Sequence, residues 1–380
     1  MATAVFKSGL PAPDYYAPNF RVEVEGQELD PSTKGDVLDV KVSMEMDNLT
    51  SFDLTFNNWD DRTLFFKYSD TNKLDINRRV HIQMGYAGRL VSMVRGMITT
   101  LTPRFPDSGS PTINVSGQDM LFRLKNSKPR DTDKPQFLKV ADWEIAEAVA
   151  TRNKLKAEVT KEGPVHAEVL QKNQDDAVFL MERAKRIDFD LFMKTDPKTG
   201  EDVLHFVKPT DGRDSRPISV YQFIYGQNLI DFSPTLSTSA QVSKLTVRGW
   251  DPRTKQAITY TADSSAIDKG GAQGTTGPAA VADSGGGSKQ DRVVDAPVTS
   301  VDEAKHLAES LLREKAYEFI TGGGRIIGLP ELRPGDNLLL DGLGKRFSGR
   351  YFVKKVTHSI GGSGYSTQFE VRKFADGGTV

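Results

Sequence analysis

The chain has 380 residues, enough for two or three domains and for a sizeable buried core. Its 50 Lys and Arg residues balance 51 Asp and Glu, and the formal net charge of −1 excludes a global attraction to nucleic acid or anionic membranes. The absence of cysteine excludes disulfides, thiol nucleophiles, iron–sulfur clusters and cysteine zinc sites.

The N-terminal stretch has no apolar segment of signal-peptide length, and Pro11 and Pro13 interrupt it early. No window approaches the roughly 20 apolar residues of a transmembrane helix. We therefore expect a soluble protein that is made in the cytoplasm.

Residues 1–125 alternate polar and apolar side chains, as half-buried strands do. In "FRVEVEG", Phe20, Val22 and Val24 fall on one face of a strand. "VLDVKVSMEM" and "SFDLTFNNW", separated by "DNLT", predict a β-hairpin, and "RVHIQMGY", "LVSMVRGMITTLTP" and "TINVSGQDM" continue the pattern. This region predicts a first tube-like antiparallel β-barrel domain.

Residues 126–216 mix helices and short strands. "VADWEIAEAVATRN" and "NQDDAVFLMERAKR" predict helices, with Asn173 as a plausible N-cap of the second and Asp175 and Asp176 in its first turn. "KLKAEVT", "DFDLFMK" and "VLHFVKP" predict strands. We expect a small α+β middle module here.

Residues 217–380 are again rich in strands and predict a second tube-like β-barrel domain. Residues 263–295 are rich in Gly, Ser, Ala and Asp, and we interpret them as a flexible insertion, because such a segment buries too little surface to offset its ordering entropy. A long C-terminal helix follows at 300–319, where Ser300 and Glu303 predict a capping box. The predicted class is thus mainly β with α+β parts.

The segment from Ile320 to His358 contains several glycines. "GGGRIIG" fits neither the phosphate-binding loop, since no Gly-Lys-Ser/Thr follows, nor the dinucleotide fingerprint, which needs a strand, then glycines, then a helix. We expect these glycines to form turns and bulges. The candidate positions for structural turns and barrel packing are Gly342, Gly344, Phe347, Gly349, Tyr351 and Trp250.

Catalytic, metal and cofactor sites are not predicted. The five histidines are scattered, and no two have the spacing of metal ligands. No Gly-x-Ser-x-Gly motif is present. Neighbouring carboxylates such as Asp60 and Asp61 are expected by chance among 51 acids.

A basic cluster, Arg123, Lys125, Lys128 and Arg130, lies between the first two regions. It is either a solvated connector, which we favour, or a positive patch at an interface or lumen that meets an acidic partner or a nucleic acid.

Four segments together resemble the phage late control protein D family, the hub proteins of contractile phage tails and related injection systems. They are "VRGMITTLTPRFPDSGSPTINVSGQDMLFRL", "VADWEIAEAVATRNKLKAEV" with "QKNQDDAVFLMERA", "LTVRGWDPRTKQAI", and the C-terminal stretch from "VTSVDEAKHLAESLL" to "YSTQFEVR". The resemblance also extends to the N-terminal part of the type VI secretion spike protein.

The resemblance implies a homotrimeric, pseudo-sixfold ring that joins a hexameric tail tube to a trimeric spike, without catalysis. The implied partners are the tail tube protein, a separate spike protein, baseplate components, and tape-measure protein or cargo in the lumen. The protein would then be assembled into a phage tail or injection-system particle. A tail-associated peptidoglycan hydrolase is the alternative, and a carbohydrate-binding adhesin is a third option. The residues themselves show no strong internal repeat.

Overall fold

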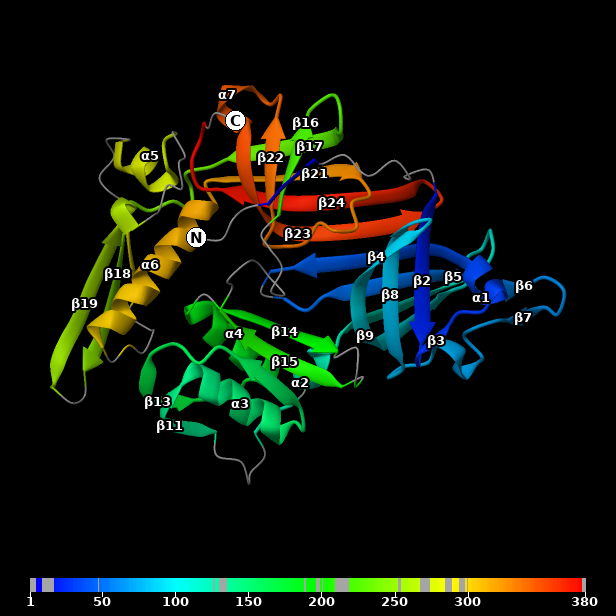
Figure 1. The fold of residues 1–380 in the computed structure, drawn as a ribbon, viewed down its shortest axis with the longest axis horizontal. Helices are drawn as coiled ribbons and strands as arrows, with labels where there is room; N and C mark the ends of the chain where they lie inside the picture. Colours follow the sequence, from blue (N-terminus) through cyan, green and yellow to red (C-terminus); the bar gives the residue numbers. More distant parts are fainter. Residues whose placement is uncertain are drawn as a thin grey trace.

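The computed structural model describes residues 5–8, 17–46, 48–125, 127–129, 135–187, 189–195, 199, 201–208, 219–251, 254–266, 274–283, 289–293, 298 and 300–377. Most of its regular structure is strand, so the mainly β class with α+β parts is confirmed (Figure 1).

The N-terminal third consists of strands joined by short connections. Its elements are β1 (Val5–Ser8), β2 (Pro18–Val24), β3 (Gln27–Glu28), α1 (Pro31–Gly35), β4 (Val37–Glu45), β5 (Ser51–Asn57), β6 (Trp59–Asp60), β7 (Phe65–Phe66), η1 (Asn72–Leu74), β8 (Arg79–Tyr86), β9 (Arg89–Arg104) and β10 (Thr112–Asp119). The predicted hairpin is β4–β5, where alternation buries Val40 and Val42 opposite Leu54 and Phe52.

The middle module packs two helices on short strands. Its elements are α2 (Phe122–Lys125), β11 (Gln136–Ala141), α3 (Asp142–Arg152), β12 (Lys156–Val159), β13 (Val165–Leu170), α4 (Asp176–Arg186), β14 (Asp190–Thr195) and β15 (Asp202–Val207). The predicted N-cap was wrong: Asp175, not Asn173, caps α4 by accepting a hydrogen bond from the Val178 amide. Asn173 instead has a φ of 50°, the left-handed geometry of a turn before the helix.

The C-terminal part completes the large sheet and adds a smaller one. Its elements are β16 (Ser219–Ile224), β17 (Leu229–Leu236), β18 (Lys244–Asp251), β19 (Gln256–Asp263), η3 (Ser264–Ala266), α5 (Gly277–Asp283), β20 (Gln290–Val293), α6 (Val301–Tyr317), β21 (Ile320–Ile327), β22 (Asn337–Asp341), α7 (Gly344–Phe347), β23 (Gly349–Gly361) and β24 (Gly364–Lys373). The predicted C-terminal helix is α6, and Ser300 caps it by accepting from the Glu303 amide.

One sheet of fourteen strands runs through both halves of the chain (Figure 1). At its centre β23 pairs antiparallel with β4, from Lys355 opposite Glu45 to Gly361 opposite Asp39. On one side of this junction the order is β4-β5-β10-β9-β8-β2, which we call the first unit. On the other side lies the second unit, β17-β21-β24-β23-β22-β16, in which β23 is the strand that meets β4.

The strands of the two units follow the same order. Numbered along the chain, the strands of each unit lie in the order second, third, sixth, fifth, fourth, first. The β4–β5 pair shifts register between Val37 and Asp39, and the β17–β21 pair shifts at the same place, between Leu229 and Asp231. The register shift of the β9–β10 pair and that of the β23–β24 pair also lie at equivalent places. The units differ in that β2 runs antiparallel to β8, whereas β16 runs parallel to β22.

The expectation that the glycines of "GGGRIIG" form turns was wrong. Residues 322–324 lie inside β21, paired on both sides with β17 and β24. A Cβ on Gly322 would lie 2.7 Å from the Phe232 ring, so the missing side chain makes room for an aromatic one.

The interpretation of 263–295 as a flexible insertion was also wrong where the segment is described. Helix α5 lies within it, with Val281 buried, and β20 pairs with β18. A Cβ on Gly277 would lie 2.0 Å from Gln241 Oε1, so glycine lets this small-residue helix approach closely.

Candidate functional site: the polar face of the shared sheet

The most extended feature shared by both units is a polar sheet face. Eight strands lie side by side in the order β17-β21-β24-β23-β4-β5-β10-β9. One face of these strands buries the two large hydrophobic cores of the units. The opposite face carries polar side chains, and a hollow of about 620 Å³ lies on it. Its lining residues come from six strands of both units, among them Lys41, Asp53, Asp231, Arg325, Lys355 and Glu370.

The polar face is held by contacts between neighbouring strands. At the junction of the units, the Ser43 and Thr357 hydroxyls lie 3.2 Å apart. The Ser359 hydroxyl donates to Asp39 at 3.1 Å, and the Ser116 hydroxyl donates to Asp53 at 2.7 Å. Such cross-strand pairs fix the register of a sheet whose outer face has no apolar packing.

Two pairs of opposite charges lie on the polar face. Arg325 lies 3.1 Å from Asp231, and Lys355 lies 3.4 Å from Glu370. Because these ion pairs are partly or largely exposed, each contributes little to stability. The result is a face that binds water well but presents no single sign of charge to a passing chain.

Beneath the junction, on the core side of β23, lies the fully buried His358. Its Nδ1 accepts from the Tyr365 hydroxyl at 3.0 Å, and its Nε2 donates to the Leu332 carbonyl at 3.2 Å. Burial, with the positive charge of Arg333, lowers the pKa of His358 to about 3. This histidine is therefore neutral at neutral pH and has a structural role.

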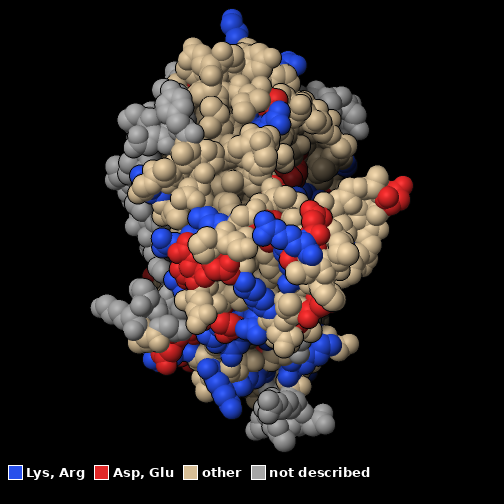
Figure 2. All heavy atoms as spheres, turned by 90° about the vertical axis from the view of Figure 1, so that its right-hand side faces the viewer, with Lys and Arg blue, Asp and Glu red and all other residues tan. Residues whose placement is uncertain are grey.

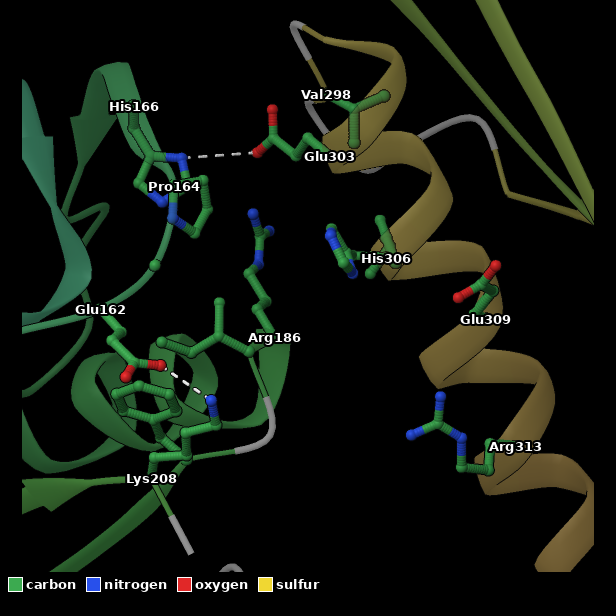
Figure 3. Close-up of a pocket in the computed structure, with 14 residues that line it drawn as sticks. Glu162, Pro164, His166, Arg186, Lys208, Val298, Glu303, His306, Glu309 and Arg313 are labelled. Atoms are coloured by element: carbon green, nitrogen blue, oxygen red, sulfur yellow. Dashed lines mark hydrogen bonds and ion pairs between the residues drawn. The ribbon is translucent and has the colours of Figure 1, made fainter. Parts of the chain in front are cut away.

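A second hollow, a cleft of about 250 Å³, lies between the middle module and α6. Figure 3 shows His166 and Arg186 facing Glu303 and His306 of the helix across it. The His166 Nδ1 lies 3.6 Å from Glu303, and its Nε2 lies 2.9 Å from Asp142. Burial works to lower the pKa of His166, but Asp142 and Glu303 outweigh it and raise that pKa above its usual value.

The acid at the base of this cleft is also coupled to an arginine. The Asp142 side chain is fully buried and accepts a hydrogen bond from Arg183 Nε at 2.5 Å. Burial works to raise the pKa of Asp142, yet His166 and Arg183 outweigh it and hold the pKa below its ordinary value. This network links β13, α3 and α4, and through Glu303 it reaches α6, so we interpret it as a joint between the module and the helix.

The predicted turn and packing positions are dispersed around the second unit. Gly342, Gly344 and Gly349 have φ values of 79°, 76° and 126°, and Tyr351 is fully buried in the core. Phe347 is the last residue of the short helix α7 and packs against the core of the second unit. One expectation differs from the structure: Trp250 is 55% exposed on β18, outside the barrel packing we expected.

The basic cluster lies apart from both hollows. Arg123 makes an ion pair with Asp202 at 3.4 Å, and the Lys128 ammonium donates to Asn173 at 3.4 Å. Lys125 is exposed at the end of α2, and Arg130 lies outside the described residues. The basic cluster is visible in the sequence because its residues are close together along the chain, whereas the residues of the polar face come together only through strand pairing.

Within the residues that the structure describes, no helix is long and apolar enough to cross a membrane. No group of three or more His, Asp or Glu residues within the same ranges could hold a metal ion.

A family model described as the Alg8 N-terminal domain matches residues 16–362. The chain belongs to the Alg8 N-terminal domain family. That name alone states no activity for its members. The comparison with curated proteins finds no match.

Solved structures show which fold this member of the Alg8 N-terminal domain family has. It is similar to the 43 kDa tail protein of prophage MuSo2 from Shewanella oneidensis, with a TM-score of 0.66 and 15% identity over 93% of this chain and 98% of that one. A tail protein from Neisseria meningitidis MC58 gives a TM-score of 0.65 and 12% identity over 94% and 97%. A type VI secretion system component from E. coli gives 0.57 and 12% over 93% and 77%. The predicted resemblance to tail and injection-system proteins is confirmed for the fold.

Proposed function

We propose that the protein is a structural hub of a contractile tail or injection-system baseplate. In this role it forms a homotrimeric, pseudo-sixfold ring between a hexameric inner tube and a trimeric spike, and it catalyses no reaction. The tube protein, a separate spike protein and baseplate components are its proposed partners, and the assembled tail or injection particle is its proposed location.

The observation that carries this proposal is the repeated unit. Each chain holds two units with the same strand order, side by side in one sheet. Three copies around an axis would present six similar units to a sixfold partner while retaining true threefold symmetry toward another. The same reasoning favours the three-part division at 1–125, 126–216 and 217–380, with the outer parts in the ring and the middle module at its periphery.

The polar face suits the lumen of such a ring. Charges of both signs lie on it, two pairs of them in contact, and its hydroxyls bond to neighbours. A solvated chain, whether tape-measure protein, cargo or DNA, would therefore pass without being retained. Figure 2 shows a different side of the molecule, where charges of both signs intermingle over the middle and lower parts and few occur on the upper part. We propose that the basic cluster, through Lys125 and Lys128, meets an acidic baseplate partner outside the lumen.

Sedimentation of the purified protein tests the proposal. We expect a trimer at micromolar concentration, or a trimer on co-expression with the spike, and an annular particle with an open centre in electron micrographs. A monomer that stays monomeric with its spike and tube partners present would overturn it. Clearing of a peptidoglycan suspension, lost on replacing one Asp or Glu, would support the hydrolase alternative instead.

A further inference from the structure

The strip of eight strands ends in two free edges within the described residues. At one end, among the described strands, β17 pairs only with β21, and its first residue, Leu229, forms an isolated bridge with Tyr225. At the other end β9 is longer than its outer partner: β8 covers it only from Arg89 to Met97, whereas β10 follows it to Arg104. Residues 99–104 therefore expose backbone groups on the side where β8 has ended. Such edges invite pairing with another strand.

Inside the chain, the edge equivalent to that of β9 is already paired with another strand. Strand β23 occupies in the second unit the place that β9 occupies in the first, and β22 covers only its first residues. Beyond β22, the remaining edge of β23 pairs with β4. Strand β4 in turn occupies the place of β17 in its own unit. The junction inside the chain thus shows how the edge of one unit joins the first strand of the next.

Because the register shifts coincide, residues of the β23–β4 junction have equivalent residues at the free edges of β9 and β17. The shared shifts make Asp39 equivalent to Asp231, and Lys355 equivalent to Thr100. We propose that residues 100–104 of β9 pair antiparallel with β17 of a second copy of this chain. The expected pairs are Leu101 with Leu236, Thr102 with Thr235, Pro103 with Pro234, and Arg104 with Ser233. This proposal rests on the proposed ring and specifies how its copies meet.

The side chains along the two edges suit this pairing. Val356 and Met44, which face each other inside the chain, are buried, whereas their equivalents Leu101 and Leu236 are only half-buried. Pairing between copies would complete the burial of these two leucines. Phe105, which directly follows β9 and whose ring packs on Phe66 with centroids 5.0 Å apart, is 60% exposed and would gain cover in the same way.

On the polar side, Thr102 and Thr235 would repeat the hydroxyl contact of Ser43 with Thr357. The opposed prolines have no N–H, so the ladder would be bonded on either side of them and not between them. Proline on a free edge also discourages pairing with an unrelated strand. These edges are therefore suited to one specific partner.

The absence of native cysteine makes disulfide trapping a direct test. In the variant Thr102→Cys/Thr235→Cys, the two positions of one chain lie at opposite ends of the strip, roughly 30 Å apart at about 4.8 Å per strand. They cannot bond to each other within one chain. Mild oxidation should convert the protein into covalent dimers and trimers on a non-reducing gel, with the single-chain band lost. Ser43→Cys/Thr357→Cys is the matched control and should form a disulfide within the chain.

Further variants test the register of the pairing and distinguish a failure of this inference from a failure of the proposed function. Thr102→Cys/Ser233→Cys, two residues out of register, should cross-link much less than the aligned pair. A wild-type trimer whose aligned variant gives no covalent trimer would overturn this inference and leave the proposed function standing. A wild-type chain that forms no trimer would count against both.

Charged substitutions at the same two positions test the pairing even if the cysteine variants fail to fold. Thr102→Glu/Thr235→Glu should shift the monomer–trimer midpoint to higher concentration, and Thr102→Lys/Thr235→Glu should shift it back. Equal midpoints for both variants would overturn the inference.

Discussion

Phe232 stands opposite Gly324 across β17 and β21, where Val40 stands opposite Leu54 in the equivalent strands of the first unit. The Phe232 ring packs against Tyr351 and Phe369, with ring centroids 5.4 and 6.1 Å away. The second unit therefore fills this part of its core from β17, and β21 contributes only backbone.

Gly324→Ala should destabilise the protein. The new Cβ would lie 2.6 Å from both Phe369 Cζ and the Asp231 carbonyl oxygen, so rings and backbone must shift. Overpacking of this kind costs about 1–3 kcal/mol, which urea unfolding would measure. Gly323→Ala is the matched control: on the same strand, its nearest neighbour would be 3.7 Å away, and we expect no loss of stability. Equal losses for the two variants would contradict this account of the core.

The exchange of large and small residues explains why the repeat cannot be read from the sequence. In the first unit Phe52 of β5 fills the core over Gly117, whose Cβ would lie 2.2 Å from its ring. In the second unit the residue equivalent to Phe52 is Gly322, and the one equivalent to Gly117 is Val371. Large and small side chains are thus redistributed among the equivalent positions, and the identity at each position differs. Alternating polarity survives such exchanges, and the sequence therefore predicted strands and the mainly β class.

Tyr351→Phe should also destabilise the second unit. Tyr351 is fully buried, and its hydroxyl donates to the Phe347 carbonyl at 2.6 Å, tying α7 to β23. Loss of the hydroxyl leaves that carbonyl without this donor, at a cost of about 1–2 kcal/mol. Tyr225→Phe, at a residue that is 57% exposed, serves as the control and should be neutral in the same denaturant titration. If the two substitutions cost the same, the bond does not hold α7 in place.

The two hollows were beyond sequence reasoning for another reason. Ser43 and Thr357, which join the units, are 314 residues apart, and His166 meets Glu303 from a separate module. Local periodicity gives the face on which a side chain lies, but not which strand or helix lies beside it. The capped helix α6 could be predicted because its signals are local, and its partner across the cleft could not.

Ser300→Ala should loosen the start of α6. The Ser300 hydroxyl accepts from the Glu303 amide at 3.1 Å, and its loss leaves that amide without a cap, at a cost of about 1 kcal/mol. Ser300→Asp keeps an acceptor at the same place and adds a charge that favours the helix dipole, so we expect it to be close to neutral. Thermal unfolding of the wild type, Ser300→Ala and Ser300→Asp measures the order of their stabilities. An aspartate variant as unstable as the alanine variant would argue against capping.

The His166 network should give the protein a measurable dependence on pH. The raised pKa of His166 means that the folded state holds a proton more tightly than the unfolded chain, whose histidine titrates near 6.5. Its contribution is complete below pH 6.5 and is lost as pH rises through the folded-state pKa. His358 acts in the opposite sense, because its lowered pKa costs stability as pH falls below 6.5.

The free energy of unfolding should therefore be compared between wild type and His166→Gln at each pH, so that the effect of His358 cancels. We expect the advantage of the wild type to be largest at pH 5.5 to 6.5 and to shrink toward alkaline pH. An advantage that grows as pH rises would show that His166 is held neutral, with Nε2 accepting from Arg183 at 2.7 Å.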